Sequence, residues 1–158
     1  MVRVGIGYDV HRLVPGRRLV LGGVEFESEV GLDGHSDADV ALHALCDALL
    51  GAAALGDIGQ HFPPSDECWR GADSLGLLGR VVEILAERGY RPGNVDLTIV
   101  AERPRIGPRV GDMRARIAGA LGVGVEAVSV KATTNEGIGF VGRGEGIAAL
   151  ATAIIEPQ

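Results

Sequence analysis

The amino-acid sequence predicts an α+β protein in which a mixed β-sheet carries helices packed on one face. Segments with strand-like or helical periodicity follow one another as strands, helix, helix, strand, helix, strand, strand. This order lacks the regular alternation of a doubly wound fold and favours helices layered on a mixed sheet. Hydrophobic residues make up 46% of the chain, which is ample for a core.

Strand signals dominate the beginning of the chain. Residues 2–8 alternate and are rich in Val and Ile, which predicts a first strand. The apolar segment 19–26 is interrupted by Gly22 and Gly23, which predicts a short strand followed by a bend or hairpin. We expect residues 31–34 to form a loop.

Two helices are predicted next, separated by a long connection. Ser36 suits the N-cap of the first helix, which should run to about Leu55 and end at Gly56. The apolar stripe of the second helix spans about residues 73–88. The connection over residues 57–71 is long enough to indicate a functional loop.

The rest of the chain is predicted to hold three strands and one helix, joined by loops rich in proline or glycine. The expected order is a strand over 95–101, a loop over 103–108, a helix over 109–121, a strand over 128–133, a loop or short helical turn over 135–146, and a strand over 147–155. The last strand is small or apolar on both faces, as is typical of a strand buried on both sides.

Composition argues against several function classes. The formal net charge of -6 disfavours non-specific binding to nucleic acid or to anionic membranes. Cys46 and Cys68 form no paired metal motif, so we expect reduced thiols in a cytoplasmic protein. We expect no secretory signal and no membrane span, because strand-like sequence begins at Val2 and no apolar run reaches ~18–20 residues. The length predicts one domain over residues 1–158.

Three residues in two segments indicate a metal site. Side chains alternate along a strand, so Asp9 and His11 should point the same way. His43 is predicted about two turns into the first helix, flanked by Asp39 and Asp47, either of which can orient its ring. One Asp and two His leave a fourth position open, as in catalytic zinc sites. An ion pair at a strand end and a mixed-charge helical face are the structural alternatives.

Two further segments suit a phosphorylated ligand. His35 and Ser36 precede a helix N-terminus, where free N–H groups attract phosphate. The segment 132–136 follows a strand and carries hydroxyls, backbone donors and one carboxylate, which suits a nucleotide diphosphate with Mg²⁺. Arg103 and Arg105 can add positive charge there. A helix cap and an ordinary polar turn are the alternative interpretations.

Several motifs occur together along the chain. They are Tyr-Asp-Val-His at 8–11, His-Ser-Asp-Ala-Asp-Val-Ala-Leu-His at 35–43, Leu-Gly-Asp-Ile-Gly at 55–59 with Phe62-Pro63, Lys-Ala-Thr-Thr at 131–134, and Gly-Arg-Gly-Glu-Gly at 142–146. In these motifs the chain closely resembles, over essentially its whole length, the 2-C-methyl-D-erythritol 2,4-cyclodiphosphate synthase family of the non-mevalonate isoprenoid pathway. The resemblance implies a homotrimer of α+β subunits, with sheets toward the threefold axis and active sites between neighbours.

The resemblance also implies a role for each matching residue. It makes Asp9, His11 and His43 the ligands of one Zn²⁺ per subunit, the first two also touching the substrate, and gives His35 and Thr134 catalytic roles. Around the methylerythritol phosphate it places His35, Ser36, Asp57, Gly59, Phe62 and Asp66. Around the cytidine diphosphate it places Ala101, Arg105, Ile106, Ala132, Thr133 and Thr134, with Glu136 on a Mg²⁺ or Mn²⁺ ion that accompanies the substrate diphosphate.

The implied reaction is an intramolecular phosphoryl transfer. The 2-phosphate of 4-diphosphocytidyl-2-C-methyl-D-erythritol 2-phosphate attacks the β-phosphorus, and CMP leaves as the cyclic diphosphate forms. The chain departs from the family pattern at Gly137, where many members have Lys, and at Pro64, where many have Asp. The departure at Gly137 concerns contacts with the substrate phosphates. The departure at Pro64 concerns how the 57–71 loop contacts the diol part of the substrate.

Two other functions fit the same residues. A zinc phosphohydrolase would use the same ligands to activate water, and would release a linear phosphate with CMP. A trimeric carrier would hold an isoprenoid diphosphate in a trimer-axis cavity lined by Phe140, Arg143 and Glu145, apolar with a charged mouth. Binding of this kind can coexist with catalysis as feedback, and the family resemblance implies Phe140 and Arg143 as ligand contacts.

Overall fold

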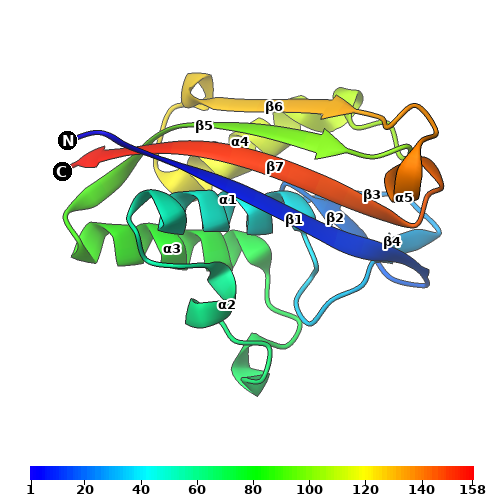
Figure 1. Cartoon of the computed structure of the whole chain (residues 1–158), viewed down its shortest axis with the longest axis horizontal. Helices are drawn as coiled ribbons and strands as arrows, with labels where there is room; N and C mark the ends of the chain where they lie inside the picture. The colour runs from blue at the N-terminus through cyan, green and yellow to red at the C-terminus, as the bar shows by residue number, and fades with distance from the viewer.

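A five-stranded mixed sheet forms one layer of the molecule, and the long helices pack against one face of it (Figure 1). The structure is a computed structural model that describes residues 1–158. The strands lie in the order β4-β1-β7-β5-β6. Their bounds are β1 Arg3–Pro15, β4 Val30–Leu32, β5 Tyr90–Val100, β6 Val128–Thr133 and β7 Gly146–Pro157, while β2 Leu19–Leu21 and β3 Val24–Phe26 form a separate hairpin. Only β5 and β6 pair in parallel, so the predicted α+β class with a mixed sheet is confirmed.

Three long helices build the second layer. The α-helices are α1 Val40–Ala52, α2 Ile58–His61, α3 Ser74–Glu87, α4 Val110–Leu121 and α5 Gly139–Gly142, and short 3-10 turns cover Glu67–Trp69, Gly107–Arg109 and Val125–Ala127. Helix α1 lies directly against β1 and β7, and α3 packs beside it (Figure 1). None of the helices combines the length and apolarity that crossing a membrane requires.

Strand β1 approaches α1 closely because two of its residues have no side chain. A Cβ atom on Gly5 would stand 2.0 Å from the carbonyl oxygen of Ala48, and one on Gly7 would stand 1.9 Å from that of Ala44. Both distances are far below van der Waals contact, so only glycine permits this packing. The close approach carries the next residues of β1 onto the first turn of α1.

Helix α1 begins later than its sequence suggests. Asp39, rather than Ser36, is the N-cap, and its carboxylate accepts a hydrogen bond from the backbone of the first turn. Ala38 has a φ of 56°, a left-handed conformation that no helix can include. His43 therefore lies in the first turn of α1 and not two turns in. The predicted end at Leu55 is also too late, because the helix stops at Ala52.

Three strand bounds need correction, while the hairpin is confirmed. The strand expected over 95–101 begins at Tyr90 and ends at Val100. The first strand continues beyond Tyr8 to Pro15. Residues 30–32, which overlap the expected loop over 31–34, pair antiparallel with residues 13–15 as β4. This short edge pairing depends on a distant segment and leaves no local pattern. Gly22 and Gly23 turn the β2–β3 hairpin in left-handed conformations.

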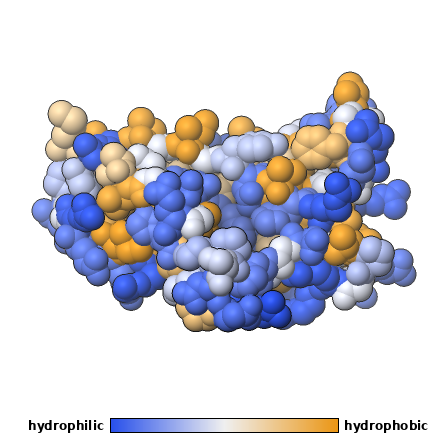
Figure 2. Space-filling model, turned by 60° about the horizontal axis from the view of Figure 1, so that its bottom comes forward, coloured by the Kyte–Doolittle hydropathy of each residue, from blue (hydrophilic) through white to orange (hydrophobic).

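The face of the sheet away from the helices carries uncovered apolar side chains. Val4, Ile6 and Tyr8 of β1 are 70%, 70% and 55% exposed, and Leu150 of β7 is 40% exposed. Tyr8 pairs with Leu150, so these residues form one continuous patch. Figure 2 shows apolar residues gathered along the upper rim of the molecule. The prediction that the last strand is buried on both faces is wrong for the single chain, because helices cover only one face.

Candidate functional site

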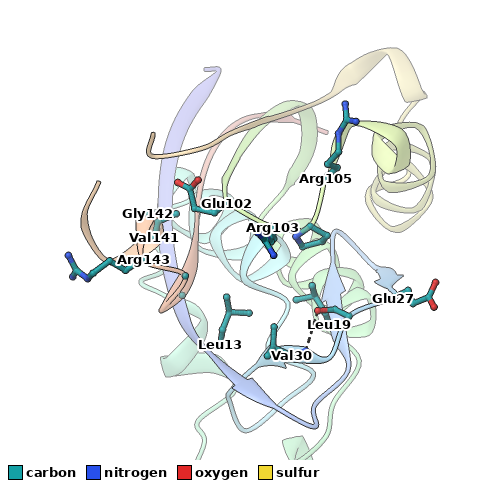
Figure 3. A pocket seen from close by; sticks show the side chains of 14 residues that line it. Leu13, Leu19, Glu27, Val30, Glu102, Arg103, Arg105, Val141, Gly142 and Arg143 are labelled. Atoms are coloured by element: carbon teal, nitrogen blue, oxygen red, sulfur yellow. Dashed lines mark hydrogen bonds between the residues drawn. The ribbon is translucent and has the colours of Figure 1, made fainter. Parts of the chain in front are cut away.

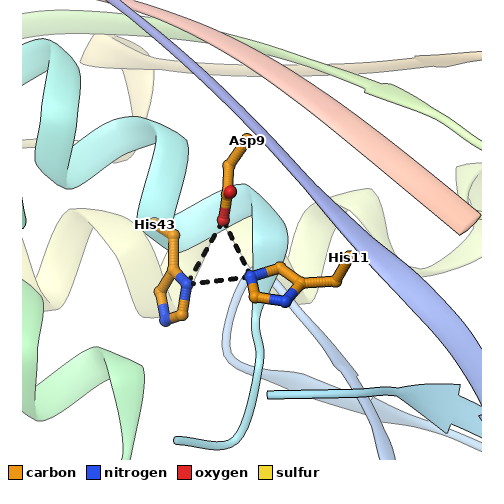
Figure 4. A group of neighbouring side chains, drawn as sticks. All are labelled: Asp9, His11 and His43. Carbon is orange, nitrogen blue, oxygen red and sulfur yellow. Dashed lines mark hydrogen bonds and ion pairs between the residues drawn. The ribbon is translucent and has the colours of Figure 1, made fainter. Parts of the chain in front are cut away.

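Asp9, His11 and His43 converge where β1 meets the first turn of α1 (Figure 4). The Oδ2 atom of Asp9 lies 2.9 Å from Nε2 of His11 and 3.3 Å from Nδ1 of His43. The same two ring nitrogens are 3.3 Å apart. One carboxylate oxygen and two imidazole nitrogens thus lie within 4.8 Å of one another, which is the arrangement of a metal-binding site.

Each imidazole is held by the nitrogen that points away from this cluster. Nδ1 of His11 donates a hydrogen bond to the backbone carbonyl of Asp33 at 2.7 Å. Nε2 of His43 lies 3.0 Å from the hydroxyl of Ser74 and 3.1 Å from that of Ser36. Outer hydrogen bonds of this kind orient the ring and leave the inner nitrogen free to bind a metal.

The two carboxylates expected to orient His43 serve other contacts. Asp39 accepts hydrogen bonds from the backbone N–H groups of Gly22 at 2.9 Å and Gly23 at 2.7 Å, and so ties the β2–β3 turn to α1. Asp47 accepts from the N–H of Ile58 at 2.7 Å and anchors α2. Asp39 and Asp47 do lie four residues before and after His43, but both carboxylates accept hydrogen bonds from backbone N–H groups instead. The expectation that either one orients His43 is therefore wrong.

Charge within the cluster favours an ionised carboxylate. Burial by itself raises the pKa of Asp9, but hydrogen bonds and charge interactions with the protonated rings of His11 and His43 together hold that pKa well below its usual range. Burial lowers the pKa of His11, but the hydrogen bond and charge of Asp9 raise it overall above its ordinary value of 6.5. The Asp9 side chain is therefore ionised throughout the neutral pH range and can act as a carboxylate ligand, whereas His11 would have to lose its proton before Nε2 could bind a metal.

A cavity of about 200 Å³ opens beside His11 and His43. Its other lining residues are His35, Ser36, Ile58, Gly59, Phe62, Pro64, Trp69 and Leu77. One wall comes from the 57–71 connection, the segment predicted to be a functional loop. Nε2 of His35 is buried and has no hydrogen-bond partner within the chain. A buried polar atom without a partner is rare, and a ligand oxygen would satisfy it.

Two predicted substrate residues on the same loop do not line this cavity. Asp57 caps α2 by accepting from the N–H of Gln60 at 3.0 Å. Asp66 caps the next turn by accepting from the N–H of Cys68 at 3.0 Å. Both carboxylates shape the loop in this structure.

The predicted nucleotide residues gather at the ends of β5 and β6. The N–H of Ala101 donates to the carbonyl of Thr133 at 3.0 Å, and the side chains of Ala101 and Ile106 are buried. These two residues can therefore offer a ligand only backbone groups. The hydroxyl of Thr134 accepts from the N–H of Glu136 at 3.1 Å, which shapes the turn after β6. None of the nucleotide residues lines the cavity beside the metal cluster.

Glu102 supports this turn and was not foreseen from the sequence. Its carboxylate accepts hydrogen bonds from the N–H groups of Asn135 at 2.8 Å and Gly137 at 3.4 Å. Gly137 has a φ of 74°, a left-handed conformation that favours glycine. No sequence signal links Glu102 to a turn more than 30 residues away.

A larger cavity, of about 920 Å³, shares no lining residue with the cavity beside His11 and His43, and Figure 3 shows it from close by. Leu13, Leu19 and Val30 form an apolar side, and the other lining residues include the charged side chains of Arg105 and Arg143. Nε of Arg143 donates to the carboxylate of Glu145 at 2.7 Å. Phe140, which the resemblance also implies as a ligand contact, does not line this cavity and is 40% exposed.

Comparison with known proteins identifies close relatives. The YgbB family model matches residues 2–156. The 2-C-methyl-D-erythritol 2,4-cyclodiphosphate synthase of Symbiobacterium thermophilum is 71% identical, over 96% of this chain and 97% of its own length. The bifunctional IspDF of Campylobacter jejuni is 38% identical, with a TM-score of 0.96 over 100% of this chain and 43% of the longer one. Plasmodium falciparum IspF in a CDP complex is 30% identical, with a TM-score of 0.87 over 99% of this chain and 97% of that one.

Proposed function

The chain belongs to the YgbB family, and we propose that Asp9, His11 and His43 hold the metal with which it forms a cyclic diphosphate. The activity is that of a 2-C-methyl-D-erythritol 2,4-cyclodiphosphate synthase, a lyase of the non-mevalonate isoprenoid pathway. It converts 4-diphosphocytidyl-2-C-methyl-D-erythritol 2-phosphate to the cyclodiphosphate and releases CMP. The observation that carries the proposal is the convergence of one carboxylate and two oriented imidazoles beside a cavity.

The donor set suits Zn²⁺, one ion per subunit. Two imidazole nitrogens and one carboxylate oxygen are typical zinc ligands, and three protein ligands leave a position for substrate. Hydrogen bonds from His11 to Asp33 and between His43 and Ser74 already hold both rings. When bound, zinc supplies Lewis-acid polarisation and a template for the phosphate oxygens.

The residues around the cluster position the substrate. His35 can donate its unpartnered Nε2–H to a phosphate oxygen, and the Ser36 hydroxyl lines the same cavity. Gly59 and Phe62 form part of the wall that encloses the methylerythritol carbons. The attacking phosphate is already anionic near neutral pH, so holding the reacting groups together and neutralising their charge account for most of the rate enhancement. No general base is required.

The nucleotide half of the site lies at the ends of β5 and β6. Backbone groups near Ala101 and Ile106 would hold the cytosine, because both side chains are buried. Thr133 and Thr134 would contact the diphosphate, and Glu136 would bind the accompanying Mg²⁺ or Mn²⁺. Positive charge from Arg105, which lines the larger cavity, would offset the diphosphate.

Two observations support a homotrimer with shared active sites. The metal cluster and the nucleotide residues do not share a cavity within one chain. The sheet face around Ile6 and Tyr8 is apolar and uncovered, and association is the economical way to bury such a patch. The trimer would place its sheets toward the threefold axis and pair the metal cluster of one subunit with Thr134 and Glu136 of its neighbour.

The remaining parts of the proposal concern setting and regulation. Residues 1–158 would form one catalytic domain, which works in the cytoplasm, where Cys46 and the exposed Cys68 stay reduced. The exposed Phe140 and the Arg143–Glu145 pair would line a trimer-axis cavity for an isoprenoid diphosphate. An isoprenoid diphosphate bound in that cavity would provide feedback regulation of the enzyme.

Analysis of the products tests the proposed function directly. In a single turnover with excess enzyme, phosphorus NMR should show a cyclic diphosphate and CMP appearing together. A linear phosphate with CMP would instead identify a zinc phosphohydrolase. Tight binding of a prenyl diphosphate with no turnover of the cytidyl substrate would identify a carrier. Either result would overturn the proposal.

A further inference from the structure

Ser74 contacts the candidate metal ligand His43 from the side opposite the cluster. It is the first residue of α3, whereas His43 belongs to α1, so the contact joins two helices. The Ser74 side chain is 0% exposed, and its hydroxyl oxygen lies 3.0 Å from Nε2 of His43. Because the Ser74 hydroxyl is fully buried, its hydrogen bonds are made within the protein interior and not to a bound ligand.

Asp37 determines how the Ser74 hydroxyl can interact. The hydroxyl donates its hydrogen to Oδ1 of Asp37, and the backbone N–H of Ser74 donates to Oδ2 of the same carboxylate at 2.9 Å. A serine hydroxyl has a single hydrogen to donate. Toward His43 it can therefore only accept, and Nε2 of His43 must carry the hydrogen.

This hydrogen-bond direction decides which nitrogen of His43 can bind a metal. With the proton on Nε2, the lone pair of the neutral ring is on Nδ1. Nδ1 is the atom that faces Asp9 at 3.3 Å and His11 at 3.3 Å. The opposite tautomer would point a hydrogen at the cluster and exclude a metal.

We propose that Asp37 and Ser74 form a relay that fixes the tautomer and ring orientation of His43, which makes Ser74 a positioning residue of the metal site. This inference rests on the proposed metal-binding function of Asp9, His11 and His43. It assigns to Asp37 and Ser74 the role that sequence reasoning gave to Asp39 and Asp47.

The relay also leaves Ser36 free for another task. The Ser36 hydroxyl oxygen accepts from the N–H of Ala38 at 3.1 Å and lies 3.1 Å from Nε2 of His43. No acceptor within the chain takes its hydrogen. Ser36 lines the cavity beside the cluster and Ser74 does not. Ser74 therefore orients the metal ligand, while the hydrogen of Ser36 is available to a phosphate oxygen.

The tautomer can be measured on the wild-type protein without any substitution of the relay. Nitrogen NMR of the metal-free protein with ¹⁵N-labelled histidine, assigned with His43→Ala, should show the neutral ring of His43 protonated at Nε2. A ring protonated at Nδ1 would overturn the inference. This measurement does not depend on whether a Ser74 variant folds.

Metal affinity provides the second test, with Co²⁺ as the probe because its visible spectrum reports coordination. We expect Ser74→Ala to weaken Co²⁺ binding by about 10- to 100-fold. Ser36→Ala, the matched control on the same ring nitrogen, should weaken it less and should mainly raise KM for the cytidyl substrate. Changing Asp37 to Asn in the Ser74→Ala background should add little to the loss, because the two residues act in series.

The outcomes separate this inference from the proposed function. Wild-type Co²⁺ affinity and spectrum in a folded Ser74→Ala protein would overturn the relay alone. Failure of the wild-type protein to bind Co²⁺ or Zn²⁺ would overturn the proposed metal site, whatever the tautomer of His43. Equal losses in Ser36→Ala and Ser74→Ala would contradict the division of roles between the two serines.

Discussion

Gly7 of β1 lies so close to Ala44 of α1 that a Cβ on the glycine would stand 1.9 Å from the Ala44 carbonyl oxygen. Ala44 follows His43, and Gly7 precedes Asp9 by two residues on the same face of β1. The absence of one side chain therefore determines how near the strand ligands come to the helix ligand. The arrangement of Asp9, His11 and His43 therefore depends on this backbone contact as well as on the three side chains themselves.

Gly7→Ala should loosen the contact and separate the ligands. We expect a loss of about 1–3 kcal/mol in the free energy of unfolding, as in other overpacked cores, together with weaker metal binding. Urea unfolding and metal titration would measure both. Gly79→Ala is the control, because a Cβ at this α3 glycine meets nothing within 4 Å and should stabilise the helix. Unchanged stability and metal affinity in Gly7→Ala would contradict the packing argument.

The raised pKa of His11 predicts a pH dependence for the metal-free protein. Because the folded pKa lies above the ordinary 6.5, the protonated ring stabilises the fold below that pH, and the contribution disappears as pH rises through the folded pKa. The free energy of unfolding should therefore fall as pH rises from 6.5, and metal affinity should increase over the same range. Asp9→Asn should reduce this dependence, because only the smaller contributions of Asp33 would then raise the pKa of His11. A wild-type protein and an Asp9→Asn variant with parallel stability profiles would refute it.

The buried side chains of Ala101 and Ile106 predict recognition of cytosine through the backbone. Replacing cytosine by uracil should lower kcat/KM by about ten- to a hundredfold, because an exchanged donor and acceptor leave a backbone group unsatisfied. Steady-state kinetics with the uridine analogue would measure the loss. Equal efficiency with both nucleotides would exclude specific base recognition here.

The sequence predicts the cluster better than it predicts the groups that support it. Strand alternation places Asp9 and His11 on one face, and helical periodicity places His43 on a helix, so local patterns reach all three candidate ligands. Ser74 lies 31 residues from His43 in the chain, and only the packing of α3 on α1 brings them together. Contacts of this kind leave no periodic signal.

Backbone conformation explains the missed boundary of α1. Ser36 and Asp39 are both good N-cap residues, and the pattern does not choose between them. The left-handed Ala38 decides in favour of Asp39, although an alanine gives no hint of positive φ. The β2–β3 hairpin was easier to predict from the sequence, because glycine is the residue that most readily adopts the left-handed conformations seen at Gly22 and Gly23.

Shared active sites predict complementation between two inactive variants. One carries His43→Ala, and the other carries Thr134→Ala together with Glu136→Ala. Refolded as an equal mixture, they should recover about a quarter of the wild-type rate, because a quarter of random interfaces pair two intact halves. Each variant refolded alone is the control. Mixed trimers that form but stay inactive, or a wild-type enzyme that is active as a monomer, would refute the shared site.

The metal content of His43→Ala tests the proposed metal centre most directly. Elemental analysis of the wild-type protein should give one zinc per subunit. His43→Ala should lose both the zinc and the cyclisation activity while keeping the wild-type circular dichroism spectrum. His61→Ala should keep its zinc, because His61 contacts the carbonyl of Leu55 and lies outside the cluster. A folded His43→Ala protein that is fully active without metal would contradict the assignment of Asp9, His11 and His43 as the catalytic metal site.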